Sequence, residues 1–186
     1  MMKETMKIEQ EGFLKERIES ERLLLFPISM QYKDEIFREF SEEITTFMHP
    51  APAKDISETE GFIENSLRGL SEGNNLQLVI LSKDSREFFG CAGLHHVDGK
   101  TPELGVWLKK LAHGKSYGKE AMTALKKWAD ENMDYDYILY PVVDKNIASQ
   151  KIPKSLGGKI EREYDAKTLN GTMHHFIEYR IYPDRK

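Results

Sequence analysis

Apolar residues recur along this 186-residue chain at two spacings, which predict a mixture of strands and helices. Short runs rich in β-branched and aromatic residues, bounded by turn-forming residues, predict strands. These runs cover 22–26, 76–82, 88–95, 102–109, 137–143, 160–164 and 174–182. The last two are expected to form an antiparallel pair with its turn at Asn170-Gly171.

Apolar spacings of three and four residues predict four helices. The most regular one begins at Lys115 or Gly118 and ends at Asn132. Residues suited to capping precede two others, Ser29 before one and Asp55 or Ser57 before the next. A short fourth helix is expected over 147–156, where Gly157-Gly158 follows.

In chain order these elements read β-α-α-β-β-β-α-β-α-β-β. That order predicts an α+β fold, with a mostly antiparallel mixed sheet, helices on both of its faces and one βαβ-like unit near its middle. A chain of this length is expected to form one domain, over 18–186. The polar, acidic residues 1–17 are expected to form an N-terminal arm, either a short helix or disordered.

Composition narrows the classes of partner and location. The formal net charge of −4 is spread along the chain, so no basic face for nucleic acid is expected. The single cysteine, Cys91, excludes an intramolecular disulfide and favours a cytoplasmic location. No run of about 18 apolar residues occurs, so no membrane span is expected. His95-His96 and His174-His175 lie on predicted strands, where neighbours point to opposite faces, so no metal site is expected.

The residues with the clearest chemical meaning lie between Glu103 and Gly118. A predicted strand leads there into a short loop containing glycine, and the loop opens the most regular helix. Such a junction directs backbone N–H groups and the positive end of the helix dipole towards one point, which suits a pyrophosphate. Lys115 and Lys119 would add positive charge at its rim. The loop contains Gly114-Lys115-Ser116, but it has Lys109 where a Walker motif needs its first glycine. It also lacks the three glycines of a dinucleotide fingerprint.

Two segments together resemble the GNAT acetyltransferase superfamily. The segment His113-Gly114-Lys115-Ser116-Tyr117-Gly118 resembles its motif A, Arg/Gln-x-x-Gly-x-Gly/Ala. About 28 residues further on, Asn146-Ile-Ala-Ser149 begins a segment that ends in Leu-Gly-Gly and resembles the second signature of the family. The start Glu-Arg-Leu-Leu-Leu-Phe-Pro-Ile at 21–28 is most similar to the branch that acetylates ribosomal-protein N-termini and small amines. The resemblance covers roughly residues 18–182.

Four positions depart from the family pattern. Gly158 stands in place of the phenylalanine of Leu-Gly-Phe, which removes one core aromatic side chain. The usual Arg or Gln is His113, and the first motif glycine is Ser116, which would be strained if that residue needs a positive φ. Many relatives place a tyrosine seven residues after the asparagine, as the acid that protonates the leaving thiolate. Here that residue is Pro153.

The resemblance implies that acetyl-CoA is the cosubstrate and that no metal is involved. It implies that the strands 103–108 and 137–143 splay apart, and that the pantetheine arm lies between them like an added strand. The backbone of Val106 and Leu108 would pair with its amides. The residues implied to hold the cofactor are Val106, Trp107, Leu108, His113, Gly114, Lys115, Ser116, Tyr117, Gly118, Lys119, Asn146 and Ser149. Gly114 and Gly118 would let the backbone approach the phosphates closely.

Direct attack by an amine requires a base, because the amine arrives protonated. Glu103 is the candidate base, since it begins the cofactor strand. If Glu103 is an ordinary solvated carboxylate, the base is a water chain or one of the paired histidines. Ser149 is the candidate acid, and a helix-capping hydroxyl is its alternative role. Backbone N–H groups near a bulge of the cofactor strand would stabilise the oxyanion.

The acceptor stays open between a protein N-terminus and a small-molecule amine. Phe47, His49 and Phe62 are candidates to line its site, because relatives build that site between the two early helices. One alternative function is a non-catalytic, acyl-CoA-binding regulatory module on the same fold. Another is binding of a nucleotide phosphate for phosphoryl transfer, which the incomplete Walker motif and the lack of clustered Asp/Glu ligands for Mg²⁺ disfavour. The oligomeric state is also open, with a homodimer as one alternative.

Overall fold

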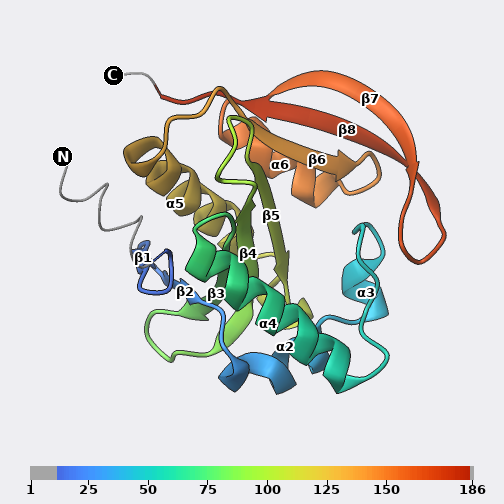
Figure 1. Cartoon of the computed structure of the whole chain (residues 1–186). Helices are drawn as coiled ribbons and strands as arrows, with labels where there is room; N and C mark the ends of the chain where they lie inside the picture. The colour runs from blue at the N-terminus through green and yellow to red at the C-terminus, as the bar shows by residue number, and fades with distance from the viewer. Residues whose placement is uncertain (1–11, 185–186) are drawn as a thin grey trace.

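The computed structural model describes residues 12–184, which form one eight-stranded sheet with helices on both faces. The strands are β1 (Ile18–Glu19), β2 (Leu23–Pro27), β3 (Leu76–Ser82), β4 (Phe88–His95), β5 (Glu103–Leu108), β6 (Ile138–Val143), β7 (Lys159–Lys167) and β8 (Met173–Ile181). Their spatial order is β1-β2-β3-β4-β5-β6-β8-β7 (Figure 1). Neighbouring strands are antiparallel except β5 and β6, which are parallel. The predicted α+β fold is confirmed.

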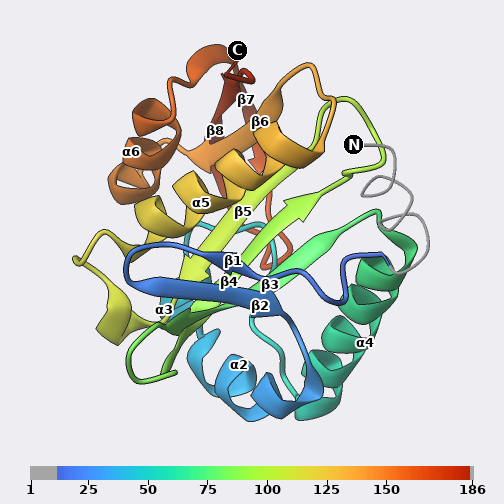
Figure 2. The same ribbon diagram turned by 90° about the vertical axis from the view of Figure 1, so that its left-hand side faces the viewer.

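The described residues 12–184 form five α-helices. They are α2 (Lys33–Glu39), α3 (Glu42–Thr45), α4 (Ile56–Glu72), α5 (Tyr117–Asn132) and α6 (Ile147–Ser155), with 3-10 turns η1 (Met30–Tyr32) and η2 (Lys110–Ala112). Figure 2 shows α5 on one side of the central strands, with α2 and α4 on the other. The long helices α4 and α5 each turn an apolar stripe to the sheet, and Leu125 of α5 and Ile63 of α4 are both fully buried. None of these helices is long and apolar enough to cross a membrane.

Capping residues set the ends of α4. Asp55 is the N-cap, and its side-chain oxygen accepts a hydrogen bond from the Ser57 backbone N–H at 2.9 Å. Gly73 ends the helix with a φ of 73°, a left-handed conformation that favours glycine. Of the two predicted caps for this helix, Asp55 is therefore the one that the structure uses.

The strands β5 and β6 splay apart in the middle of the sheet. They share a single paired position, Glu103 with Leu139, and the Leu139 N–H donates to the Pro102 carbonyl at 2.8 Å. Beyond that point β6 stays paired with β8 along its whole length, so it follows the β7–β8 hairpin away from β5 (Figure 1). The splayed pair is thus the place where the sheet opens.

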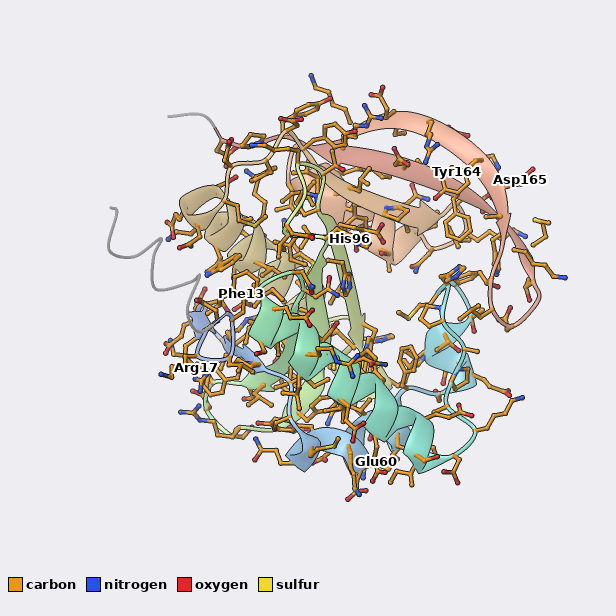
Figure 3. All side chains as sticks on the ribbon, viewed as in Figure 1. Phe13, Arg17, Glu60, His96, Tyr164 and Asp165 are labelled. Atoms are coloured by element: carbon orange, nitrogen blue, oxygen red, sulfur yellow. The ribbon has the colours of Figure 1, made fainter. Side chains whose placement is uncertain are left out.

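Three features differ from the predicted elements. The strand β1 and the one-turn helix α3 were not predicted, because each is too short to show a period. The β7–β8 hairpin is longer than predicted, since nearly every residue of β7 is exposed and its sequence is polar. The described part of the N-terminal arm packs on the domain: Phe13 is buried and its ring meets Trp128 edge-on (Figure 3).

Candidate functional site

Two cavities meet where β5 and β6 diverge. The first, of about 550 Å³, lies among α2, α4 and the splayed strands. We name it the aromatic cavity after the phenylalanine, tryptophan and tyrosine side chains in its lining. The second, of about 560 Å³, lies against the loop before α5, and we name it the loop cavity. The residues that line both are Met48, Val106, Trp107, Asn146 and Ser149. The two cavities therefore adjoin at the same strand edge.

The loop cavity contains the N-terminal end of α5. The first helical hydrogen bond runs from the Glu120 N–H to the Ser116 carbonyl at 3.0 Å, so the three preceding N–H groups have no partner within the helix. The N-cap side chain makes no capping hydrogen bond either. Helix geometry and dipole together make this end suited to an anion. The sequence-predicted residues that line the cavity are Val106, Trp107, Leu108, His113, Gly114, Ser116, Tyr117, Gly118, Lys119, Asn146 and Ser149.

Ser116 adopts the conformation that was expected to strain it. Its φ is 63°, in the left-handed region, where the Cβ atom of a non-glycine residue crowds the backbone. Gly114, two residues earlier, has a φ of 76° and meets no such crowding. The loop therefore holds a strained serine where the family pattern has glycine.

Gly118 serves packing. A Cβ atom added there would lie 3.5 Å from Ile152 Cδ1 and 3.6 Å from Leu108 Cδ1. A side chain larger than alanine would press on α6 and β5. Gly118 also lines the loop cavity, so its close approach to the phosphates stays a prediction.

A charged network fixes the outer side of the loop. The Glu120 carboxylate accepts hydrogen bonds from the Ser20 hydroxyl at 2.6 Å, the Arg22 N–H at 2.8 Å and Arg22 Nε at 2.7 Å. Arg22 Nη2 donates to the Lys115 carbonyl at 3.1 Å, and the guanidinium lies 4.6 Å from the Tyr117 ring centre. Burial opposes ionisation of Glu120, but these donors lower its pKa below the ordinary value. Lys115 itself does not line the loop cavity.

The edge of β5 that faces the opening carries backbone groups of alternate residues. The Lys109 N–H donates to the Phe89 carbonyl on β4 at 2.7 Å. Because backbone groups of successive strand residues point to opposite edges, the N–H and C=O groups of Val106 and Leu108 face the opening between β5 and β6. The Leu108 carbonyl lies 2.8 Å from His113 Nε2, so it already has a partner. Lys151 of α6 also lines the loop cavity, a cation that the sequence pattern did not indicate.

The expected bulge is absent from the register of β5. Its pairing with β4 runs without a shift from Leu108 opposite Gly90 to Glu103 opposite His95. The register shifts of the described sheet lie between Ile80 and Leu81 and in the β7–β8 hairpin. The prediction of oxyanion donors at a bulge of this strand was wrong, because β5 stays regular on β4 and the opening comes from β6.

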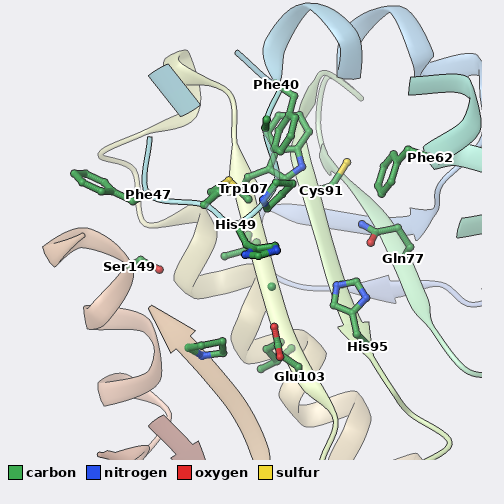
Figure 4. Close-up of a pocket in the computed structure, with 18 of the residues that line it drawn as sticks. Phe40, Phe47, His49, Phe62, Gln77, Cys91, His95, Glu103, Trp107 and Ser149 are labelled. Atoms are coloured by element: carbon green, nitrogen blue, oxygen red, sulfur yellow. The ribbon is translucent and has the colours of Figure 1, made fainter. Parts of the chain in front are cut away.

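Figure 4 shows the aromatic cavity from inside. Its aromatic walls are Phe40, Phe47, Phe62, Trp107 and Phe176. The three sequence-predicted acceptor residues, Phe47, His49 and Phe62, line it. Phe40 and Trp107 pack with ring centres 4.9 Å apart.

Glu103 and His95 form the polar end of the aromatic cavity. They stand opposite each other on β5 and β4, and within residues 12–184 neither side chain has a hydrogen-bond partner. A Cβ atom on Gly93 would lie 2.6 Å from His95 Nε2, so this glycine makes room for the imidazole. Burial raises the pKa of Glu103 and lowers the pKa of His95. Of the four paired histidines, His95 is the one that lines this cavity.

The remaining paired histidines have other surroundings. His175 contacts the carboxylates of Glu163 and Asp165 on the exposed side of the hairpin, and those contacts raise its pKa (Figure 3). The His174 ring lies against Phe47 and Phe176.

Ser149 and Tyr140 form a hydroxyl pair at the junction of the cavities. Asn146 is the N-cap of α6 and accepts the Ser149 N–H at 3.1 Å, so the capping role considered for Ser149 belongs to Asn146. The Ser149 hydroxyl instead lies 3.0 Å from the Tyr140 hydroxyl. Burial raises the pKa of Tyr140 to about 12. The sequence placed Tyr140 in the predicted strand 137–143, and no motif indicated a functional role for it.

A model of the GNAT acetyltransferase domain matches residues 22–159. The chain therefore belongs to the GNAT acetyltransferase family, and it is an acetyl-CoA-dependent N-acetyltransferase.

The individual relatives share only a small part of their sequence with this chain. The uncharacterized N-acetyltransferase p20 of Bacillus licheniformis is 27% identical over 81% of this chain and 88% of its own. The structure of RimL, a ribosomal L7/L12 α-N-protein acetyltransferase in complex with coenzyme A, superposes with a TM-score of 0.83 at 17% identity, covering 92% of this chain and 100% of that one. The structure of the microcin C7 self-immunity acetyltransferase MccE, in complex with acetyl-CoA and AMP, superposes with a TM-score of 0.77 at 20% identity. The match covers 88% of this chain and 93% of that one. The two structures share the fold of this chain.

Proposed function

We propose that this protein transfers the acetyl group of acetyl-CoA to a primary amine by direct attack within a ternary complex. The observation that carries the proposal is the junction of the two cavities at Val106, Asn146 and Ser149. A cofactor in the loop cavity and an amine in the aromatic cavity would meet there without leaving the protein. Holding two reactants in contact supplies much of the rate of such a transfer.

In this proposal the loop cavity holds the cofactor. The first N–H groups of α5 bind the pyrophosphate, with Lys119 and Lys151 adding positive charge. The backbone of Val106 pairs with the pantetheine arm, and the Asn146 side-chain nitrogen donates to it while its oxygen caps α6. Acetyl-CoA, when bound, supplies the acetyl group as an activated thioester.

Glu103 is the proposed general base. The amine arrives as an ammonium, with a pKa of about 10 for a lysine-like group, and Glu103 accepts one of its protons. The nitrogen lone pair then attacks the thioester carbonyl carbon, a C–N bond forms and the C–S bond breaks. The nitrogen loses its second proton as the amide forms, and this proton replaces the one that the leaving sulfur takes up. Because burial raises the pKa of Glu103, its carboxylate is a stronger base than an exposed one.

Ser149 is the proposed acid at the leaving sulfur. It lines both cavities, and its hydroxyl is paired with that of Tyr140 at 3.0 Å. The pKa of Tyr140, near 12, keeps that phenol protonated at neutral pH, so it donates to Ser149 as Ser149 donates to sulfur. This hydroxyl pair would protonate the leaving thiolate, which Pro153, at the position of the tyrosine of many relatives, cannot do.

Cys91 supports direct attack over an acetylated enzyme. It is the single cysteine of the chain and lies at the wall of the aromatic cavity. Burial strongly raises the pKa of its thiol, which therefore stays protonated and poorly nucleophilic.

The test is the release of coenzyme A thiol from acetyl-CoA in the presence of a broad panel of primary amines. The proposal predicts amine-dependent release and an N-acetylated product. Tight acetyl-CoA binding with no amine-dependent release would favour the regulatory module. Competition of ATP for the same site would favour the nucleotide alternative.

A further inference from the structure

We propose that the acceptor is a small primary amine with an apolar body of aromatic size and no acidic group. The inference rests on the proposed acetyl transfer and concerns the aromatic cavity. Its volume of about 550 Å³ lies within the range of small-molecule sites, about 300–1,000 Å³.

The charges of the aromatic cavity have one sign. Its lining includes the carboxylates of Glu58 and Glu103 and the imidazoles of His49 and His95, and within residues 12–184 no lysine or arginine lines it. Burial lowers the pKa of His95, so this imidazole stays neutral at physiological pH. An ammonium group is favoured in such a cavity, whereas a carboxylate or phosphate on the acceptor would be repelled by the carboxylates of Glu58 and Glu103.

Three uncharged polar side chains of the wall, Gln77, Tyr140 and Ser149, already have partners. The Gln77 amide donates to the Ala92 carbonyl at 3.2 Å, and the hydroxyls of Tyr140 and Ser149 are paired. An extended peptide carries a donor and an acceptor at every residue, each of which needs a partner when buried. The aromatic rings instead offer contact area to an apolar body and their faces to an ammonium.

The loop that forms one wall is held in place from the far end of the chain. The Leu169 N–H donates to the His49 carbonyl at 2.9 Å, and Thr168 beside it is buried. The Phe47 ring lies 6.1 Å from that of His174. Figure 1 shows the loop after α3 beside the tip of the β7–β8 hairpin. This connection restricts the space through which a longer substrate would leave the cavity.

Glu103 and His95 lie apart from part of the aromatic wall. Figure 4 places Glu103 and His95 together and Phe40 away from them. Phe62, on α4, is 42% exposed and lies at the mouth. A bound monoamine would therefore direct its nitrogen to Glu103 and its body to the rings.

The experiment compares four acceptors by kcat/KM for thiol release: 2-phenylethylamine, L-phenylalanine, 1,4-diaminobutane and a serine-initiated peptide. The first two differ only by a carboxylate. We expect 2-phenylethylamine to exceed phenylalanine by about 100-fold or more, as expected for a like-charge contact, and to exceed the diamine and the peptide. Preference for phenylalanine, the diamine or the peptide would overturn this inference and leave the acetyl transfer standing. No transfer to any amine, with acetyl-CoA bound, would overturn both.

A matched pair of variants tests the sign of the charge. Phe62→Arg places a cation at the mouth of the cavity and should reduce the ratio of 2-phenylethylamine to phenylalanine by about tenfold or more. Phe37→Arg makes the same change on α2, at 36% exposure and outside the cavity lining, and should leave the ratio unchanged. An unchanged ratio in Phe62→Arg, with the thermal shift by coenzyme A intact, would contradict the assigned position of the acceptor.

Discussion

At the scale of single residues, Glu103 combines burial with the lack of a partner. Its carboxylate has no hydrogen-bond donor within residues 12–184, and burial raises its pKa. A carboxylate kept in this state costs stability, and such groups gather at functional sites. Both consequences can be measured.

Glu103→Gln should lower kcat by about 10²–10⁴, the range of one acid–base group, with coenzyme A affinity unchanged. Glutamine keeps the shape of the side chain and removes its capacity to accept a proton. Glu64→Gln, an exposed change on the outer side of α4, is the control and should leave kcat unaltered. In the wild type, kcat/KM should rise with pH through a pKa above the ordinary carboxylate range. Near-normal kcat in Glu103→Gln would assign the base elsewhere, with His95 next to test.

The same variant should gain stability at neutral pH. The folded-state pKa of Glu103 is raised, so ionisation is harder in the folded chain than in the unfolded one. The cost is absent below the unfolded pKa, about 4.3, and grows as pH rises through the folded pKa. Urea unfolding should therefore show Glu103→Gln more stable than wild type at pH 7, with the difference vanishing in acid. If Glu103→Gln were less stable than wild type at pH 7, burial would not make ionised Glu103 destabilising.

Ser116→Gly should also stabilise the protein. Relief of the left-handed conformation recovers about 1–2 kcal/mol, and the greater freedom of glycine in the unfolded chain offsets about 0.4–1 kcal/mol. The net expectation is about 0.5–1 kcal/mol by urea unfolding. Ser71→Gly, at an exposed helical position of α4, should change stability in the opposite direction. Destabilisation by Ser116→Gly would show that the serine side chain has a stabilising role of its own.

At the scale of elements, the loop before α5 is held by the turn between β1 and β2. Arg22 joins Glu120 and the Lys115 carbonyl, and its guanidinium stacks on Tyr117. The loop is thereby ordered before a ligand arrives, which lowers the entropic cost of binding.

Arg22→Met should weaken coenzyme A binding about tenfold, equivalent to about 1.4 kcal/mol, by isothermal titration calorimetry. Arg38→Met removes an exposed ion pair far from the loop and is the matched control. The pKa of Glu120 is lowered in the folded state, so its stabilisation is present above the unfolded pKa and lost as pH falls through the folded pKa. The stability difference between Arg22→Met and wild type should shrink in acid. An unchanged coenzyme A affinity in Arg22→Met would show that Arg22 does not order the loop before α5 for binding.

Strands and loop residues differ in how far the sequence predicted them. The bounds of β3 and β4 were predicted as observed, because strands with buried residues on both faces give unbroken apolar runs between turns. The loop residues near Gly114 were predicted together because they are adjacent in the chain. Arg22 and Glu120 are 98 residues apart, and one sequence gives no sign that they meet.

At the scale of the whole molecule, function depends on the opening between two parts of the sheet. The aromatic cavity needs the loop after α3 and the hairpin tip, which are distant in sequence and joined by a backbone hydrogen bond between His49 and Leu169. Backbone contacts carry no residue pattern, so the shape of the acceptor site could not be predicted. The splay itself was predicted through family resemblance, and the structure explains it by the pairing of β6 with β8.

The most direct test of the whole account is an initial-velocity study in which acetyl-CoA and 2-phenylethylamine are both varied. Two cavities that join at Ser149 predict a ternary complex, and double-reciprocal plots should then give intersecting lines. An acetylated-enzyme intermediate would give parallel lines and burst release of thiol without amine. Parallel lines would contradict direct attack at the splayed strands, and intersecting lines are the result that this structure predicts.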